Sequence, residues 1–274
     1  MHYRKIGRTT EEIPIVGIGT WAMGGSPARD RQAVKALKLG LDLGMTFIDT
    51  AEMYGSGHSE ELVAESLKGR KEKVFVASKV SPQHFAYDDV LRSARLSLKR
   101  LQLKQMDLYQ LHWPNPSIPI SETMRAMETL VREGSVRHIG ISNYSVSQTK
   151  EAEAALSRDK IVSNQVEYSL VDRSIEQDIL PYCQKEGLTV IAYSPLGQGK
   201  IPRGRGDPFK TLDAIAERLG RSREQVALNW VLQHESVVVI PKASDEDHVR
   251  QNAEVIDWNI SRDDFEKLNE AFQS

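Results

Sequence analysis

The sequence of 274 residues contains a single cysteine, Cys183. One thiol excludes an intramolecular disulfide and a thiolate metal cluster, and it is typical of a protein that stays in the reducing cytoplasm. We expect Cys183 to be a small residue on the face of a helix. No apolar run reaches the roughly 18 residues that a membrane span requires. Residues 1–14 carry charges where a signal peptide would be apolar, so we predict a soluble cytoplasmic protein without a membrane partner.

The sequence also lacks a strong excess of charge of either sign. Its 36 basic and 38 acidic residues leave a net charge of −2. No basic tract is longer than a helix end such as residues 68–73, which argues against a nucleic-acid partner. His58, His84 and His138 are scattered along the chain rather than clustered with carboxylates, so we predict no metal site.

What the sequence does contain is a regular alternation of apolar, β-rich segments with amphipathic helical segments. The predicted strands are residues 16–19, 46–49, 74–78, 106–112, 136–142, 162–166, 189–192 and 237–240. The predicted helices are residues 29–43, 60–68, 88–101, 121–132, 148–156, 175–185, a pair within 209–234, and 262–272. Eight strands alternating with helices predict an α/β fold, a (β/α)₈ TIM barrel that forms one domain over residues 1–274.

Short local signals support these boundaries. Segments 174–177 and 222–225 each begin with Ser and end with Gln, which fits a capping box at the start of a helix. Gly134 and Gly187 fall where a helix needs a left-handed final residue. Two short strands around a turn at residues 8–10 predict an N-terminal β-hairpin that closes the barrel floor.

Polar side chains follow the predicted strands at the end where such barrels carry their chemistry. Asp49 ends the second strand and Tyr54 lies in its loop, Lys79 ends the third strand, and His112 ends the fourth. A tyrosine with a pKa near 10 is a poor proton donor until a nearby cation lowers that value. Lys79 can be that cation, with Asp49 orienting it. Tyr54 would then protonate a carbonyl oxygen while His112 orients the carbonyl or shares the proton.

Each of these four residues also has a simpler interpretation. An Asp and a Lys on adjacent strands can form a buried ion pair, a histidine at a strand end is often only hydrogen-bonded, and a loop tyrosine usually serves packing. The convergence of all four at one end of the barrel favours the catalytic interpretation over the four separate structural ones.

Seven segments resemble the aldo-keto reductase superfamily, in order and along nearly the whole chain: FIDTAEMYGSGHSEE, VASKV, LYQLHWPNP, GISNYS, NQVEYS, AYSPLGQG and IPKAS. The resemblance, to bacterial or archaeal members with a short C-terminal tail, implies a TIM barrel that binds NADPH or NADH without a Rossmann domain. It implies an oxidoreductase that reduces aldehydes or ketones to alcohols by hydride transfer. It also implies that Asp49, Tyr54, Lys79 and His112 form a catalytic tetrad.

The resemblance also supplies a cofactor site, because the sequence holds no G-x-G-x-x-G fingerprint in a proper setting. It implies that Ser142, Asn143 and Gln165 hold the nicotinamide carboxamide, that Tyr193 stacks on the ring, and that Lys242 contacts the adenosine 2′-phosphate. The other implied cofactor residues lie at the first strand end, in the seventh loop and around the eighth strand: Gly19, Thr20, Trp21, Asp49, Ser194, Leu196, Gly197, Gln198, Ile240, Ala243, Ser244, His248, Gln251 and Asn252.

Three positions near Lys242 depart from the pattern of better-known members of the superfamily. Ala243 stands where a serine is usual, His248 where an arginine is usual, and Gln251 where a glutamate meets adenine. Lys242 favours NADPH as the cofactor, and these departures keep NADH open.

Aromatic residues around the predicted mouth indicate an apolar pocket for a small carbonyl substrate. The predicted substrate contacts are Trp21, Tyr54, His112 and Trp113, with Met53 and Phe85 as further candidates. The chain ends soon after the last predicted helix, so we expect an open pocket with broad specificity.

Two other classes of function remain open at this point. One is a regulatory or redox-sensing subunit that keeps the reductase fold and its bound nucleotide, although this chain starts almost at the barrel. The other is a metal-dependent barrel hydrolase, which is disfavoured because only His112 among the histidines considered ends a strand. We expect a monomer or a weak homo-oligomer.

Overall fold

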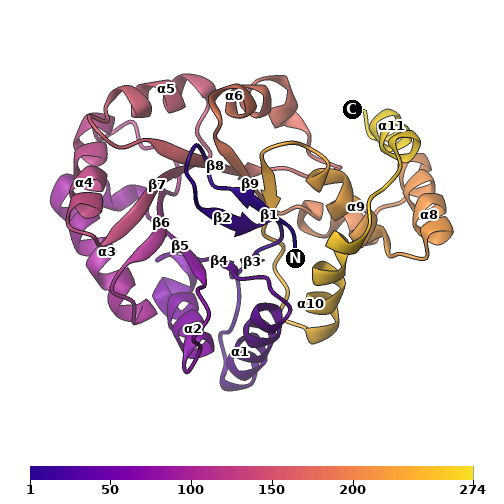
Figure 1. Cartoon of the computed structure of the whole chain (residues 1–274), viewed down its shortest axis with the longest axis horizontal. Coiled ribbons are helices and arrows are strands. Elements are labelled where there is room, and N and C mark those ends of the chain that lie inside the picture. The colour runs from indigo at the N-terminus through magenta and orange to yellow at the C-terminus, as the bar shows by residue number, and fades with distance from the viewer. Residues whose placement is uncertain (274) are drawn as a thin grey trace.

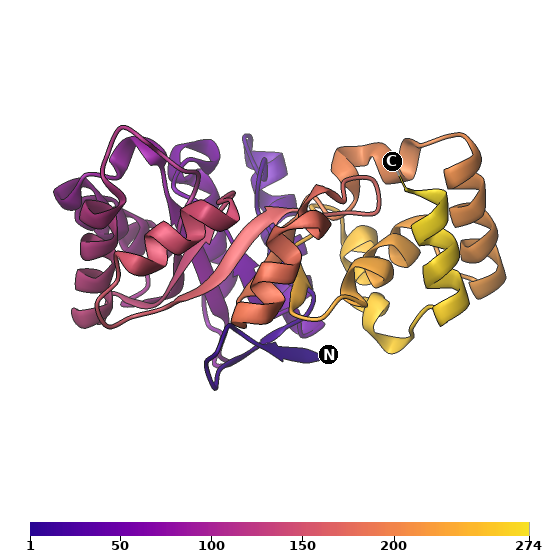
Figure 2. The ribbon, with the colours of Figure 1, turned by 90° about the horizontal axis from the view of Figure 1, so that it is seen from above.

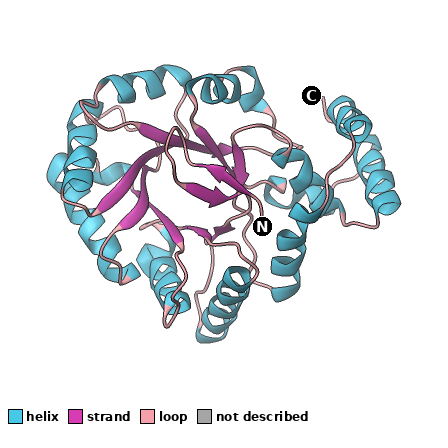
Figure 3. Cartoon of the chain, viewed as in Figure 1, coloured by secondary structure: helices cyan, strands magenta, loops and turns pink. Residues whose placement is uncertain are grey.

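Eight parallel strands form the centre of the molecule in the computed structural model, which describes residues 1–273 (Figures 1 and 3). They are β3 (Ile18–Gly19), β4 (Phe47–Asp49), β5 (Phe75–Val80), β6 (Met106–Leu111), β7 (Val136–Ser142), β8 (Ile161–Glu167), β9 (Thr189–Tyr193) and β10 (Val237–Val239). Their spatial order follows the chain, and parallel bridges from Val16 to Val239 and from Gly19 to Lys242 join the two edges. The sheet therefore closes, and the predicted barrel is confirmed.

Most helices surround the strands on the outside, and α8 and α11 lie to one side beyond α9, as Figures 1 and 2 show. They are α1 (Pro27–Asp42), α2 (His58–Leu67), α3 (Tyr87–Leu101), α4 (Ile120–Arg132), α5 (Val146–Ala154), α6 (Ile179–Glu186), α7 (Lys200–Arg203), α8 (Asp207–Leu219), α9 (Arg223–Leu232), α10 (Glu246–Ala253) and α11 (Arg262–Ala271). Within residues 1–273, no helix is both long and apolar enough to cross a membrane. Cys183 lies on α6 and is fully buried, and burial raises the pKa of its thiol to about 12.

The N-terminal hairpin closes the barrel at the amino ends of the strands. Its strands, β1 (Tyr3–Lys5) and β2 (Glu12–Pro14), pair antiparallel and lie across the ring of strands in Figure 1. Ile6 and Ile13 are fully buried in the cluster that fills the barrel interior. Gly7 has φ of +57°, and a Cβ there would lie 2.8 Å from Val162, so this turn requires glycine. The predicted barrel floor is confirmed.

Most of the predicted helix-end signals are present in the structure, and one is not. The capping box from Ser222 to Gln225 is present, and Gly134 and Gly187 adopt positive φ. The capping box predicted at Ser174 is wrong. Residues Ser174–Gln177 form a separate 3-10 turn, η3, and α6 starts after Asp178, whose side chain accepts from the Ile179 backbone N–H.

A capping box that the sequence reasoning missed begins α5. The Ser145 side chain accepts from the backbone N–H of Gln148, and the Gln148 side chain accepts from the backbone N–H of Ser145. The helix therefore starts at Val146, two residues before the predicted boundary.

Candidate active site

The carboxyl ends of the barrel strands surround a cavity of about 390 Å³. Residues from the strand ends and their following loops line it: Gly19, Thr20, Trp21, Asp49, Met53, Tyr54, His112, Trp113, Ser142, Asn143, Gln165, Tyr193, Ser194, Gln198, Ile240 and Lys242. Lys79 reaches Asp49 and Tyr54 from beneath this surface. The structure thus brings together all four predicted catalytic residues, as well as most of the predicted cofactor residues.

Three residues of the tetrad, Asp49, Lys79 and Tyr54, lie at the ends of β4 and β5 and in the loop that follows β4. Lys79 Nζ donates to Asp49 Oδ1 at 2.5 Å, to the Thr50 backbone oxygen at 3.0 Å and to the Tyr54 hydroxyl at 3.2 Å. Tyr54 begins the 3-10 turn η1 (Tyr54–Gly57), where Gly55 has φ of +58°. This left-handed backbone turns the chain into α2 directly after Tyr54. The phenol therefore stays beside the ammonium group of Lys79.

Burial decides how these charges behave. The side chain of Lys79 is fully buried and that of Asp49 is 2% exposed. Burial is the largest single effect on Lys79 and lowers its pKa, but the charges of Asp49 and Tyr54 and their hydrogen bonds together outweigh burial and raise it. The pKa of Tyr54 is also raised from its ordinary value, because burial exceeds the lowering effect of Lys79. The sequence-based expectation that a cation would bring this pKa below its ordinary value is therefore wrong for the free protein.

His112 follows β6 directly and is neutral over the physiological pH range. Burial and the charge of Lys79 lower its pKa to about 2. The imidazole packs edge-on to the Tyr54 ring, with 5.6 Å between centroids, and stacks on the Trp113 ring at 4.1 Å. Among the residues that the structure describes, its buried Nδ1 has no hydrogen-bond partner. A neutral imidazole can orient a carbonyl by donating a hydrogen bond from its ring N–H.

The residues expected to hold a nicotinamide carboxamide form one connected group beside the tetrad. Tyr193 OH donates to Asn143 Oδ1 at 2.9 Å, and Asn143 Nδ2 donates to Ser142 Oγ at 3.0 Å and to the His112 backbone oxygen at 3.1 Å. Asn143 has φ of +63°, a conformation that asparagine tolerates better than most residues. The Gln165 amide also reaches the tetrad, because Nε2 donates to Asp49 Oδ2 at 2.8 Å.

The residues expected around the rest of the cofactor divide into two sets. Ser194, Gln198, Ile240 and Lys242 line the same cavity as Asp49, Tyr54 and His112. The residues that do not line it are Leu196, Gly197, Ala243, Ser244, His248, Gln251 and Asn252. The cavity thus has the aromatic ring of Tyr193, the amides of Asn143 and Gln165, and the ammonium group of Lys242. This combination fits a nicotinamide nucleotide that carries a phosphate at its far end.

Three exposed apolar side chains surround the mouth of the cavity. Trp21, Met53 and Trp113 are 68%, 46% and 41% exposed, and all three line the cavity. Phe85, the remaining predicted wall residue, is 1% exposed and belongs to the hydrophobic core. The prediction for Phe85 is wrong, because the residue follows the short turn η2 (Pro82–His84) and packs inward before α3 begins.

The sequence reasoning missed one polar residue of this site, Gln110. It lies within β6, is fully buried, and donates from Nε2 to Asp49 Oδ2 at 3.1 Å. The available signal was a glutamine inside the apolar strand segment MDLYQL, since a buried amide requires a hydrogen-bond partner.

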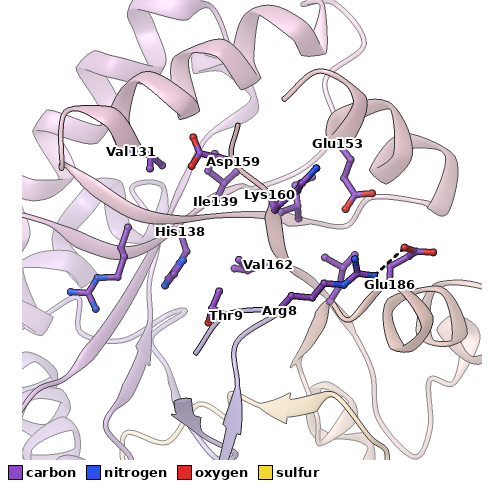
Figure 4. A pocket seen from close by; sticks show the side chains of 13 residues that line it. Arg8, Thr9, Val131, His138, Ile139, Glu153, Asp159, Lys160, Val162 and Glu186 are labelled. Atoms are coloured by element: carbon purple, nitrogen blue, oxygen red, sulfur yellow. Dashed lines mark hydrogen bonds and ion pairs between the residues drawn. The ribbon is translucent and has the colours of Figure 1, made fainter. Parts of the chain in front are cut away.

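A second cavity, of about 480 Å³, lies at the opposite end of the barrel beside the hairpin turn (Figure 4). Charged side chains line it, among them Arg8, Asp159, Lys160 and Glu186. Arg8 pairs with Glu186 at 3.3 Å and is 69% exposed, so this pair is solvated. None of the predicted site residues lines this cavity.

Comparisons with known proteins agree with this barrel and its strand-end site. The Aldo/keto reductase family matches residues 15–273. The methylglyoxal reductase YeaE of Escherichia coli is 40% identical over 260 residues, which cover 95% of this chain and 91% of that protein. A thermostable aldo-keto reductase, Tm1743, solved with the inhibitor epalrestat, matches with a TM-score of 0.92 and 42% identity over 99% of this chain and all of that one.

A solved relative also contains a cofactor. The aldo/keto reductase from Klebsiella pneumoniae, in complex with NADP and acetate, matches with a TM-score of 0.88 and 40% identity, covering 95% of this chain and 92% of that one. The chain therefore belongs to the aldo/keto reductase family. It is an NAD(P)H-dependent oxidoreductase that reduces carbonyl groups to alcohols.

Proposed function

We propose that this chain uses NADPH to reduce small reactive carbonyls such as methylglyoxal, with Tyr54 as the proton donor. The observation that carries the proposal is the 3.2 Å contact between Lys79 Nζ and the Tyr54 hydroxyl. This contact lies in a cavity that also holds amide groups and exposed aromatic rings.

In this proposal, Ser142, Asn143 and Gln165 hold the carboxamide of the nicotinamide, Tyr193 lies against the ring, and Lys242 meets the 2′-phosphate. When bound, NADPH supplies the hydride that reduces the carbonyl carbon. The protein contributes by fixing the face and the plane of the ring, so that the reacting atoms meet in one orientation.

Tyr54 supplies the proton that the reduced oxygen requires. Its raised pKa keeps the phenol protonated at neutral pH, the state that a general acid needs before reaction. Once the proton leaves, the phenolate lies 3.2 Å from the ammonium group of Lys79, which stabilises the new negative charge. Asp49 holds that ammonium in place through Oδ1. The lysine thus acts on the product of proton transfer more than on the resting phenol.

The mouth supports a small substrate with modest apolar surface. The exposed side chains of Trp21, Met53 and Trp113 form apolar walls. None of these three side chains carries a charge that would bind one particular substrate. His112 Nε2 would receive the carbonyl oxygen next to Tyr54. Similarity to a methylglyoxal reductase supports 2-oxoaldehydes as the substrate class. We expect broad specificity among small aldehydes.

The test is NADPH oxidation at 340 nm with methylglyoxal and a panel of simple aldehydes, wild type beside Tyr54→Phe. We expect kcat to fall by about 10²- to 10⁴-fold in the variant, the range for a lost general acid. The dissociation constant for NADPH should stay within about twofold, because the phenol is not a proposed cofactor contact. Tyr3→Phe, on the exposed floor hairpin, is the matched control. Full activity in Tyr54→Phe would contradict the assignment of the proton donor.

A further inference from the structure

Gln110 occupies a fully buried position inside the barrel, one strand away from the catalytic lysine. Its neighbours in register are Lys79 on β5 and Gly140 on β7. Partners in register point to the same face of a sheet, so the Gln110 amide shares the barrel interior with the Lys79 ammonium. A buried primary amide is costly unless it is hydrogen-bonded, and this one is bonded to the site itself.

The Gln110 amide forms a closed triangle with two site residues. Its Nε2 donates to Asp49 Oδ2 at 3.1 Å, and its Oε1 accepts from Gln165 Nε2 at 3.3 Å. Gln165 Nε2 also donates to the same Asp49 Oδ2 at 2.8 Å. Lys79 occupies the other oxygen, Oδ1, at 2.5 Å. Both carboxylate oxygens of Asp49 are therefore held, one by the ammonium group and one by two amides.

The neighbouring strand leaves room for this arrangement. A Cβ on Gly140 would lie 2.8 Å from Cγ of Gln110 and 2.8 Å from Oγ of Ser163. Gly140 has no positive φ, so its backbone conformation does not require glycine. The requirement is space, and Gln110 and Ser163 are the side chains that come nearest to it.

We propose that Gln110 is a positioning residue that ties the nicotinamide-binding amide of Gln165 to the proton-donating group through Asp49. The chain of contacts runs from Gln165 to Asp49, then through Lys79 to the Tyr54 hydroxyl. Gln110 braces the first two members of that chain at once. The inference rests on the roles of Gln165 and Tyr54 given under the proposed function.

Two consequences distinguish this role from ordinary packing. An amide held by Gln110 presents Gln165 to the cofactor in one orientation, so the loss of Gln110 weakens NADPH binding through Gln165. The same loss leaves Asp49 Oδ2 with a single donor, so the Asp49–Lys79 pair is less well fixed when Tyr54 gives up its proton. Contacts to the carbonyl substrate stay as they are, so KM for the carbonyl should change little.

The test is Gln110→Leu, which removes the amide at similar size, in the full-length protein. We expect the dissociation constant for NADPH to rise about 5- to 10-fold and kcat to fall about 10-fold, as for one lost hydrogen bond to a charged group. KM for methylglyoxal should stay within about twofold. In a Gln165→Leu background, Gln110→Leu should change the NADPH dissociation constant by no more than about twofold, because the coupled partner is already gone.

Ser163→Ala is the matched control, since its hydroxyl is buried in the same part of the barrel without a partner. It should leave kcat and NADPH binding unchanged. Thermal unfolding and circular dichroism establish that each variant is folded before kinetics are compared. Equal effects of Gln110→Leu in the wild-type and Gln165→Leu backgrounds, or wild-type kinetics in a folded Gln110→Leu, would overturn the inference. Loss of the proposed function itself would appear differently, as wild type that binds no NADPH or reduces no carbonyl.

Discussion

The two ends of the barrel carry cavities of similar size, about 390 Å³ at the mouth and about 480 Å³ at the floor, and charged side chains reach both. They differ in how those charges are held. At the mouth, Lys79 and Asp49 are almost fully buried and are bonded at 2.5 Å. At the floor, Arg8 is 69% exposed and its partner Glu186 is 35% exposed, 3.3 Å apart (Figure 4).

The difference shows that neither cavity size nor the number of charges marks the active site. Solvent screens the Arg8–Glu186 pair, so it can alter neither a neighbouring pKa nor a barrier by much. Burial at the mouth, together with the charge of Lys79 acting in a medium of low dielectric constant, lowers the pKa of His112 to about 2. The buried charges at the carboxyl ends of the strands can therefore take part in catalysis. The hairpin at the other end of the barrel only closes its floor.

The largest effect should come from removing the buried cation at the mouth. Lys79→Met leaves Asp49 buried without its partner, so we expect a loss of about 3 kcal/mol or more in the free energy of unfolding. We also expect kcat to fall at least about 100-fold, because the Tyr54 phenolate loses its counter-charge. Urea unfolding and NADPH oxidation measure the two effects. If Lys79→Met kept the wild-type kcat, the buried pair at the mouth would matter no more for catalysis than the exposed pair at the floor.

A smaller effect should follow from the exposed cation at the far side of the mouth. Lys242→Ala should lower the NADPH-to-NADH ratio of kcat/KM about 10-fold, the loss of one charge-assisted contact to phosphate. Lys99→Ala, on the outer helix α3, is the matched control for a lost surface charge. An unchanged ratio would mean that other residues select the cofactor.

At the floor, titration should alter stability and leave catalysis alone. Burial by itself raises the pKa of Glu11, but hydrogen bonds from Lys73 and His138 and the charge of Arg137 outweigh it and lower the pKa below the ordinary 4.5. The stabilisation is therefore present above the unfolded pKa and is lost as pH falls through the folded pKa. Glu11→Gln should lower the melting temperature at pH 7, and this difference should shrink below about pH 4.5.

Glu12→Gln changes an exposed neighbouring carboxylate and controls for the lost charge. A melting-temperature difference for Glu11→Gln that stays constant as the pH falls from 7 to well below the ordinary pKa of 4.5 would contradict the ion-pair explanation. So would a matching loss in Glu12→Gln.

The smallest effect should come from the exposed floor pair. Arg8→Ala should change the free energy of unfolding by no more than about 0.5 kcal/mol and should leave kcat within about twofold of wild type. Urea unfolding and the same NADPH assay measure both. A tenfold loss of activity would show that the floor communicates with the mouth.

The sequence predicted the barrel well, because its signals are local and repeated. Buried parallel strands are apolar runs, and these were found within one or two residues. The capping box at Ser174 failed because it requires a continuous helix after the cap, whereas the chain turns again at Asp178, with φ of −147°. Phe85 failed because an aromatic residue after a strand can point into the mouth or into the core, and composition does not distinguish the two.

The sequence predicted that the tetrad residues meet, because the ends of parallel strands lie at one edge of the sheet. It did not predict the direction in which the pKa of Tyr54 shifts. The direction of the Tyr54 pKa shift depends on how completely the ring is buried, which a sequence does not display. Gln110 was missed for a related reason. A single glutamine in an apolar strand gives no indication of whether its partner is a backbone group or Asp49, and only the folded barrel brings the Gln110 amide to Asp49 Oδ2.

The pH dependence of kcat for methylglyoxal reduction at saturating NADPH tests most directly whether Tyr54 gives the proton and whether Lys79 governs its acidity. We predict that kcat of the wild type falls as pH rises through the pKa of Tyr54, and that this limb is absent from the residual activity of Tyr54→Phe. In Lys79→Met the limb should move to higher pH, because Lys79 lowers the pKa that burial raises. The same limb in Tyr54→Phe, or an unmoved limb in Lys79→Met, would contradict these two roles.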